Sequence, residues 1–191
     1  LYPNPASVLA FIENHDTDRF LGEGDNLPML KQASTLLLTT RRIPQLYYGT
    51  EVMMNGVMSK SDGYVRKDFP GGWTGDATNA LTPAGRTKIQ NECYDFYKTI
   101  LNWRKGNDVI AKGSMVQFMV QNGVYAYARQ YEGKTIFVML NGTDAETTVP
   151  LKFYKEILKD SKQGKDILSG KAITFGEELK MGPRESLVIE L

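Results

Sequence analysis

The residues best suited to chemistry stand in one polar run near the start of the chain. Glu13-Asn14-His15-Asp16-Thr17-Asp18-Arg19 follows a short apolar stretch from Ser7 to Ile12. Such a stretch predicts a strand buried on both faces, as in a parallel sheet. Sites in α/β folds lie at the carboxyl ends of these strands. A carboxylate beside an imidazole suits binding of polyol hydroxyls or stabilisation of a developing positive charge. The alternative is a polar cluster that only ends the strand.

The composition narrows the chemistry to a few side-chain types. The 191 residues include one His and one Cys, which excludes a zinc site built from His or Cys and an internal disulfide framework. Lys and Arg number 23 against 22 Asp and Glu, a net charge of +1. This balance gives no support to a nucleic-acid partner or a polybasic membrane patch. No apolar stretch approaches the length of a transmembrane segment. Catalysis would rest on carboxylates, hydroxyls, His15 or a missing partner.

The first half of the chain predicts a strand, a helix and a second strand. Asn26 can cap a helix that begins at Leu27 and ends at residues 40–42. A second apolar stretch, Ile43 to Gly49, follows it. Two strands joined through a helix form a parallel unit with a right-handed crossover. A further helix is expected from Pro83 to about Arg104.

A long polar loop, residues 56–80, separates the second strand from the last helix. Loops of this length in compact domains usually have a function. We expect Asp62 and Arg66 to form a salt bridge at the rim of the site, with direct ligand contact by Arg66 as the alternative. Trp73 is expected to seal the loop against the fold, with stacking on a sugar ring as its alternative. Arg19 is expected to fix the first polar turn by pairing with a nearby carboxylate, namely Asp16, Asp18 or Glu23.

The second half of the chain has the pattern of an antiparallel β-sandwich. Short runs rich in Val, Phe, Tyr, Ile and Thr are separated by hairpin turn signals at Asn122-Gly123, Glu132-Gly133 and Asn141-Gly142. The expected strands cover residues 115–120, 124–131, 135–140, 172–175 and 186–191. One short helix is expected over residues 153–159.

Three segments, in order, resemble a known family. Phe11-Ile12-Glu13-Asn14-His15-Asp16 resembles the seventh-strand segment of the α-amylase superfamily, glycoside hydrolase family thirteen. The segment from Ile43 to Glu51 resembles the eighth strand of that family. The segment from Asp62 to Trp73 is similar to the loop after the barrel in neopullulanases and cyclomaltodextrinases.

The resemblance implies a fold and an activity. Residues 1–104 would be the last strands and helices of a catalytic (β/α)8 TIM barrel, an incomplete one, and residues 105–191 the C-terminal β-sandwich called domain C. The parent would be a retaining α-glucan hydrolase cleaving α-1,4 and perhaps α-1,6 glucosidic bonds. Its nucleophilic Asp and acid/base Glu would lie outside this chain, so the chain alone is expected to be inactive. The alternative is a non-catalytic glucan-binding or structural module derived from the same fold.

The resemblance also implies roles for four residues and a set of partners. Asp16 corresponds to the transition-state stabiliser, and His15 would hydrogen-bond the same sugar. Asn14 would contact substrate or form a turn, and Arg66 would line the site. Some family members bind calcium, but no loop here matches an EF-hand, so we expect no metal or other cofactor in this chain. Relatives of this type also suggest a homodimer of the parent. Localisation stays open, with the bacterial cytoplasm or periplasm favoured.

Overall fold

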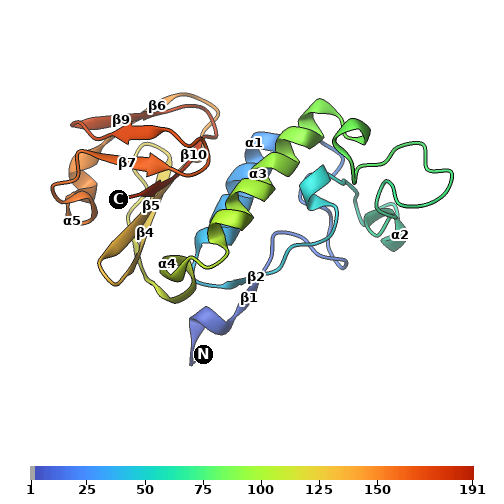
Figure 1. The fold of residues 1–191 in the computed structure, drawn as a ribbon, viewed down its shortest axis with the longest axis horizontal. Coiled ribbons are helices and arrows are strands. Elements are labelled where there is room, and N and C mark those ends of the chain that lie inside the picture. Colours follow the sequence, from blue (N-terminus) through green and yellow to red (C-terminus); the bar gives the residue numbers. More distant parts are fainter. Residues whose placement is uncertain (1–2) are drawn as a thin grey trace. The chain divides into compact units, whose positions relative to one another are not determined.

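The computed structural model describes residues 3–191, which divide into two compact units (Figure 1). Unit 1 comprises the residues up to Leu37 together with Arg42–Lys98. Unit 2 comprises Leu38–Arg41 and Thr99–Leu191. No helix in the described part of the chain is long and apolar enough to cross a membrane.

Unit 1 is built around one parallel strand pair and two helices. Strands β1 and β2 pair in parallel and are connected through α1, as predicted. Asn26 accepts a hydrogen bond from the backbone N–H of Met29 at 3.0 Å, which caps α1. The elements that begin in this unit are η1 (Pro5–Ser7), β1 (Leu9–Ala10), α1 (Leu27–Thr39), β2 (Ile43–Pro44), η2 (Thr50–Val52), α2 (Asp62–Val65), η3 (Pro83–Gly85) and α3 (Lys88–Arg104).

Helices α1 and α3 pack against each other within unit 1. The hydroxyls of Ser34 and Tyr97 lie 2.5 Å apart in the buried contact. At the exposed rim, Lys31 Nζ lies 2.6 Å from Glu92 Oε1.

The two strands of unit 1 are shorter and more exposed than the sequence predicts. Each contains two residues, and the side chains of Leu9 and Ile43 are both 51% exposed. The expectation of strands buried on both faces is therefore wrong for the described residues. The physical reason is that, in the described part of the chain, β1 and β2 pair only with each other, so both outer edges of the pair are open.

Unit 2 is an antiparallel β-sandwich, as the sequence predicts. Six strands form one sheet in the order β3-β4-β5-β10-β7-β8, and β6 pairs with β9 in a second, two-stranded sheet. The elements are α4 (Asp108–Lys112), β3 (Ser114–Gln117), β4 (Val124–Tyr131), β5 (Lys134–Asn141), β6 (Thr147–Pro150), η4 (Leu151–Tyr154), α5 (Lys155–Leu158), β7 (Gln163–Asp166), β8 (Ala172–Thr174), β9 (Glu178–Met181) and β10 (Ser186–Glu190).

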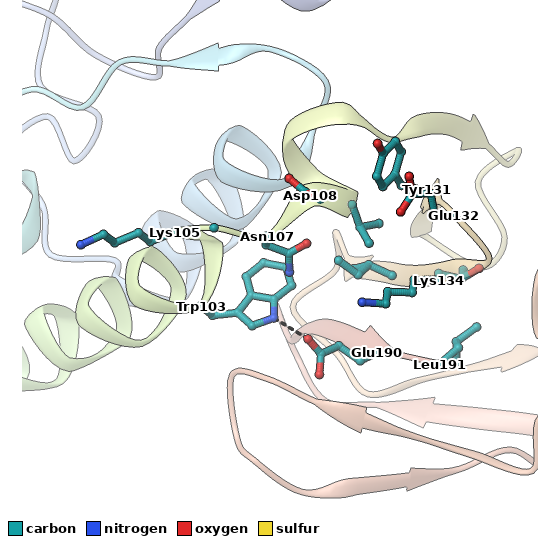
Figure 2. Close-up of a pocket in the computed structure, with 13 residues that line it drawn as sticks. Trp103, Lys105, Asn107, Asp108, Tyr131, Glu132, Lys134, Glu190 and Leu191 are labelled. Atoms are coloured by element: carbon teal, nitrogen blue, oxygen red, sulfur yellow. Dashed lines mark hydrogen bonds between the residues drawn. The ribbon is translucent and has the colours of Figure 1, made fainter.

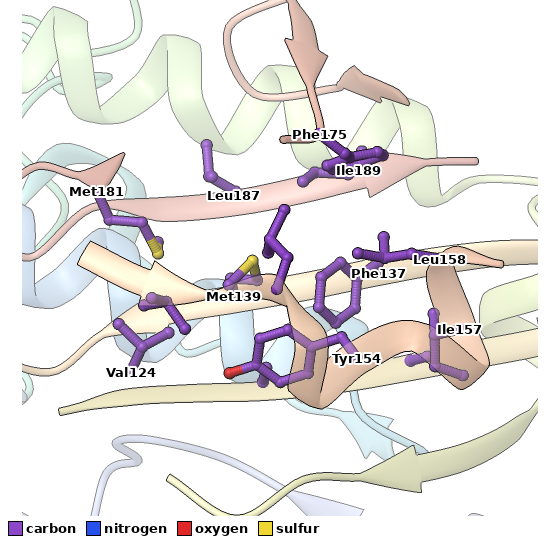
Figure 3. Packing of buried hydrophobic residues seen from close by; sticks show 14 residues of the cluster. Val124, Phe137, Met139, Tyr154, Ile157, Leu158, Phe175, Met181, Leu187 and Ile189 are labelled. Carbon is purple, nitrogen blue, oxygen red and sulfur yellow. The ribbon is translucent and has the colours of Figure 1, made fainter. Parts of the chain in front are cut away.

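Strand alternation gives the large sheet two buried faces. One face packs on β6, β9 and α5 around Phe137, Met139 and Tyr154 (Figure 3). The opposite face, with Tyr127 and Val138, packs on α4. Side chains two residues apart on a strand share a face, so each core draws on every second residue of β4 and β5.

The hairpin between β4 and β5 follows its turn signal. Glu132 and Gly133 have φ of 48° and 78°, the left-handed pair that a two-residue hairpin turn requires. The hairpin expected at Asn141-Gly142 is wrong. The side chain of Asn141 instead donates to the carbonyls of Ala145 and Gly182, and the chain leaves the sheet so that β6 pairs with β9.

Candidate functional site

Three of the four predicted site residues contact one another on an exposed turn of unit 1. Arg66 Nη2 lies 3.0 Å from Asp16 Oδ1, and His15 Nε2 lies 3.1 Å from Asp16 Oδ2. Arg66 Nε also donates to the backbone carbonyl of His15 at 2.9 Å. The Asp16 side chain is 65% exposed, so its carboxylate stays open to a ligand. The contact between Arg66 and Asp16 joins residues 50 positions apart, and sequence reasoning did not identify it.

Asn14 forms the turn that presents Asp16. Its Oδ1 accepts a hydrogen bond from the backbone N–H of Asp16 at 2.8 Å. Its own N–H donates to Thr17 Oγ1 at 3.1 Å. The turn-forming alternative for Asn14 is therefore realised, and contact with a ligand stays a prediction.

A buried ion pair lies beneath the turn. Arg19 Nη1 lies 3.4 Å from Glu13 Oε1, with both side chains at most 2% exposed. Glu13 also accepts hydrogen bonds from the Phe20 N–H and the Thr50 hydroxyl. Arg19 fixes the turn as expected, but the expected partners Asp16, Asp18 and Glu23 are wrong. Glu13 takes the place of these carboxylates because Arg19 points into the interior, away from the exposed edge.

The guanidinium of Arg19 joins the turn to two other segments. It donates to the carbonyl of Val65 at 3.0 Å and to that of Tyr48 at 2.6 Å. Its carbon also lies 3.9 Å from the centre of the Tyr47 ring, a cation–π contact. Composition gave no signal for this arrangement, because all three partners are distant in sequence.

The long loop supplies the remaining residues of the site. Arg66 Nη2 lies 3.4 Å from Asp62 Oδ2, which confirms the predicted salt bridge. Helix α2, capped by Ser61, places these two side chains one turn apart. Trp73 is 72% exposed, so the expectation that it seals the loop is wrong for the described residues.

The arrangement offers acceptors and donors to a polyol. Asp16 supplies carboxylate oxygens, and His15 and Arg66 supply donors within one turn and one loop. Retaining glycoside hydrolysis needs two carboxyl groups about 5 Å apart that act as nucleophile and acid/base. Among the described residues no group of three or more His, Cys, Asp or Glu could hold a metal ion. The Asp16 carboxylate and its neighbouring donors therefore suit the binding of hydroxyls and the stabilisation of a positive charge.

Comparison with known proteins finds a matching domain model and similar proteins. Residues 115–190 match the model of the cyclo-malto-dextrinase C-terminal domain. An α-amylase of Niallia circulans is 30% identical over 176 residues, which cover 88% of this chain and 29% of that protein. A cyclomaltodextrin glucanotransferase of Thermoanaerobacterium thermosulfurigenes is 31% identical over 168 residues, covering 84% of this chain and 21% of that protein. The chain thus spans less than a third of the length of these relatives.

The fold is shared with solved structures as well. The crystal structure of an α-amylase from Geobacillus thermoleovorans in complex with acarbose aligns with a TM-score of 0.76 at 23% identity. The alignment covers 99% of this chain and 40% of that one. Residues 115–190 thus match the cyclo-malto-dextrinase C-terminal domain, and most of the chain is similar to one part of α-amylases and cyclomaltodextrin glucanotransferases.

Proposed function

We propose that this chain is the carboxyl-terminal part of a retaining α-glucan hydrolase of the cyclomaltodextrinase or neopullulanase type. The enzyme would cleave α-1,4 glucosidic bonds, with α-1,6 bonds as a second candidate. The observation that carries the proposal is the exposed Asp16 carboxylate held between His15 and Arg66 at the end of β1. The nucleophile and the acid/base would be supplied by a part of the enzyme outside this chain.

Exposed apolar side chains in unit 1 support an incomplete barrel. Leu9, Phe11 and Ile43 belong to or adjoin the parallel strand pair, and all three are exposed. Parallel strands with open edges and uncovered apolar faces are rare in a stable soluble domain. Further strands of a (β/α)8 barrel would cover both, with residues 1–104 as its last part and residues 105–191 as domain C.

The geometry gives each site residue a distinct role toward the sugar. A carboxylate has about four acceptor positions, and Arg66 and His15 occupy one on each oxygen of Asp16. The remaining positions suit two neighbouring hydroxyls of one sugar ring. Asp16 would thereby hold the ring and stabilise the positive charge that develops in the transition state. His15 would donate to the same sugar, Asn14 would shape the turn, and Arg66 would orient Asp16.

The test is hydrolysis of maltoheptaose by the complete enzyme that contains this chain. Asp16→Asn is expected to lower kcat about 10²- to 10³-fold, the loss seen when one preorganised electrostatic contact is removed. KM should change little, because the amide can still bind hydroxyls. Asp18→Asn is the matched control, since Asp18 lies in the same turn but its carboxylate binds the backbone N–H of Met58.

Two outcomes would contradict the proposal. Activity of Asp16→Asn equal to that of Asp18→Asn would remove Asp16 from the transition state. Glucan binding by the complete protein without any hydrolysis would instead favour a non-catalytic glucan-binding module. The isolated chain of 191 residues is expected to release no sugar above background.

A further inference from the structure

A pocket in unit 2 lies apart from the turn that carries Asp16. Its volume is about 610 Å³, within the range of about 300–1,000 Å³ typical of small-molecule sites. The end of α3, the start of α4, the β4–β5 hairpin and the end of β10 line it. All of these residues belong to unit 2, so the pocket is complete within that unit.

Trp103 forms the aromatic wall of this pocket. Its indole packs partly against the core and donates from Nε1 to Glu190 Oε1 at 2.7 Å (Figure 2). That bond fixes the plane of the ring, so the indole presents a rigid apolar face. The face of an aromatic ring carries partial negative charge, which attracts positively polarised C–H groups.

Polar side chains of both signs surround the indole. Figure 2 shows the side chains of Asn107, Lys134 and Glu190 around the space beside the ring. Lys134 is a donor, Glu190 is an acceptor with one oxygen already on the indole, and Asn107 caps α4 through its Oδ1. A ligand there meets an apolar face, a donor and an acceptor at once.

The chemistry of this lining selects among ligand classes. An apolar ligand would strip water from Lys134 and Glu190 without replacing their hydrogen bonds. A small anion would meet the carboxylates of Glu132 and Glu190, and a small cation would meet Lys134. A neutral sugar ring has C–H faces for the indole and peripheral hydroxyls for both charged groups.

We propose that the Trp103 pocket is a second sugar-binding site, which takes a segment of a neutral α-glucan chain. The identity of the glucan rests on the proposed function, whereas the preference for a neutral sugar rests on the pocket itself. The role that we assign to this site is to hold substrate. Its effect would be to raise the local concentration of glucan near the enzyme.

The experiment follows the indole N–H signals of the chain by NMR during titration with maltoheptaose. The chain contains two tryptophans, Trp73 and Trp103, so Trp73→Phe assigns the remaining signal to Trp103. We expect the Trp103 signal to shift and to saturate with a dissociation constant of about 1 mM, which is the affinity of a weak site with few contacts. Succinate, a small dianion, should leave it unmoved.

Two variants separate binding from folding. Trp103→Ala removes the stacking face but also part of the core packing, so Lys134→Ala is the second variant. Lys134 is exposed, and its loss should weaken maltoheptaose binding about fivefold, the worth of one hydrogen bond, with an unchanged spectrum of the free chain. Lys180→Ala is the matched control, since Lys180 is an exposed lysine of β9 that does not line the pocket, and it should bind as the wild type does.

The result distinguishes this proposal from the proposed function. A Trp103 signal unmoved by maltoheptaose, or one moved by succinate instead, overturns the second site. Lys134→Ala binding as tightly as Lys180→Ala also overturns it. Asp16→Asn should give the same Trp103 shift as the wild type, because Asp16 lies in the other unit. An experiment that disproves the role of Asp16 in hydrolysis would therefore not contradict the proposal for the Trp103 pocket.

Discussion

Replacing Arg129 should remove the strongest polar anchor of the β-sandwich. Arg129 lies on β4 with its side chain fully buried, and it donates only to backbone carbonyls in the bonds described. The acceptors are Thr39 at 2.9 Å, Ile110 and Gly113 at 2.8 Å each, and Ser114 at 3.1 Å. Burial lowers the pKa of Arg129 to about 10, so the guanidinium remains charged at neutral pH.

The cost of Arg129→Met follows from these four bonds. A buried acceptor that loses its partner costs about 1–3 kcal/mol. Removing the buried charge offsets part of the cost of the four lost bonds. We therefore expect the free energy of unfolding of unit 2 to fall by about 3–5 kcal/mol. Arg129→Lys should lower the free energy of unfolding by about half as much. Its ammonium can reach some of the carbonyls, but not all of those that a planar guanidinium reaches.

The assay is urea unfolding followed by Trp103 fluorescence in a Trp73→Phe background, where Trp103 is the sole tryptophan. Arg184→Met is the matched control, because Arg184 is only partly buried and pairs with the exposed Asp144, so its loss should shift the midpoint little. If Arg129→Met unfolds the unit entirely, it gives no midpoint to measure. Arg129→Lys, the milder change, then supplies the measurement. A loss below about 1 kcal/mol in both Arg129 variants would refute the anchoring argument.

Three further predictions concern burial and exposed edges. Burial raises the pKa of the Cys93 thiol to about 12, so iodoacetamide should leave the native chain unmodified and alkylate it only after unfolding, as mass spectrometry would show. Burial also raises the pKa of Tyr127; the unfolded state then releases its proton near pH 10 while the folded state keeps it, so stability should fall as pH rises above about 10. In urea unfolding at several pH values, the stability of Tyr127→Phe should fall less with rising pH than that of the wild type. An equal fall in the two proteins would contradict this prediction. Limited proteolysis of the chain should cut before Asp108 and spare the sandwich, and uniform resistance would count against an incomplete barrel in unit 1.

Local sequence signals predicted the elements whose geometry is set by their own residues. The β4–β5 hairpin follows from Glu132-Gly133, because a two-residue turn needs left-handed backbone that Gly adopts without strain. The start of α1 follows from the Asn26 cap in the same way. Asn141-Gly142 carries the same signal, yet its Asn side chain is used by distant carbonyls, and tertiary contacts decide the path of the chain.

The candidate site was predictable only in its exposed part. Asp16, His15 and Asn14 are adjacent in sequence, so their types and order were enough to make them candidates. Their support comes from Arg66 and Arg19, whose partners lie in other segments of unit 1. Hydrogen bonds across 46 to 50 residues leave no periodic or local pattern. The partners of a buried arginine therefore have to be read from the structure.

Burial divides the polar run after β1 into two layers with different consequences for mutation. Glu13 and Arg19 are buried and satisfy each other and nearby backbone groups, so truncating either would leave the other as an unpaired buried charge, a loss of folding. Asp16 and His15 are exposed, so changing them should cost little stability. Arg66 belongs to the exposed layer, where it holds the His15 carbonyl and the Asp16 carboxylate with one guanidinium. The long loop that carries Arg66 therefore sets the orientation of Asp16 from outside the strand that precedes it.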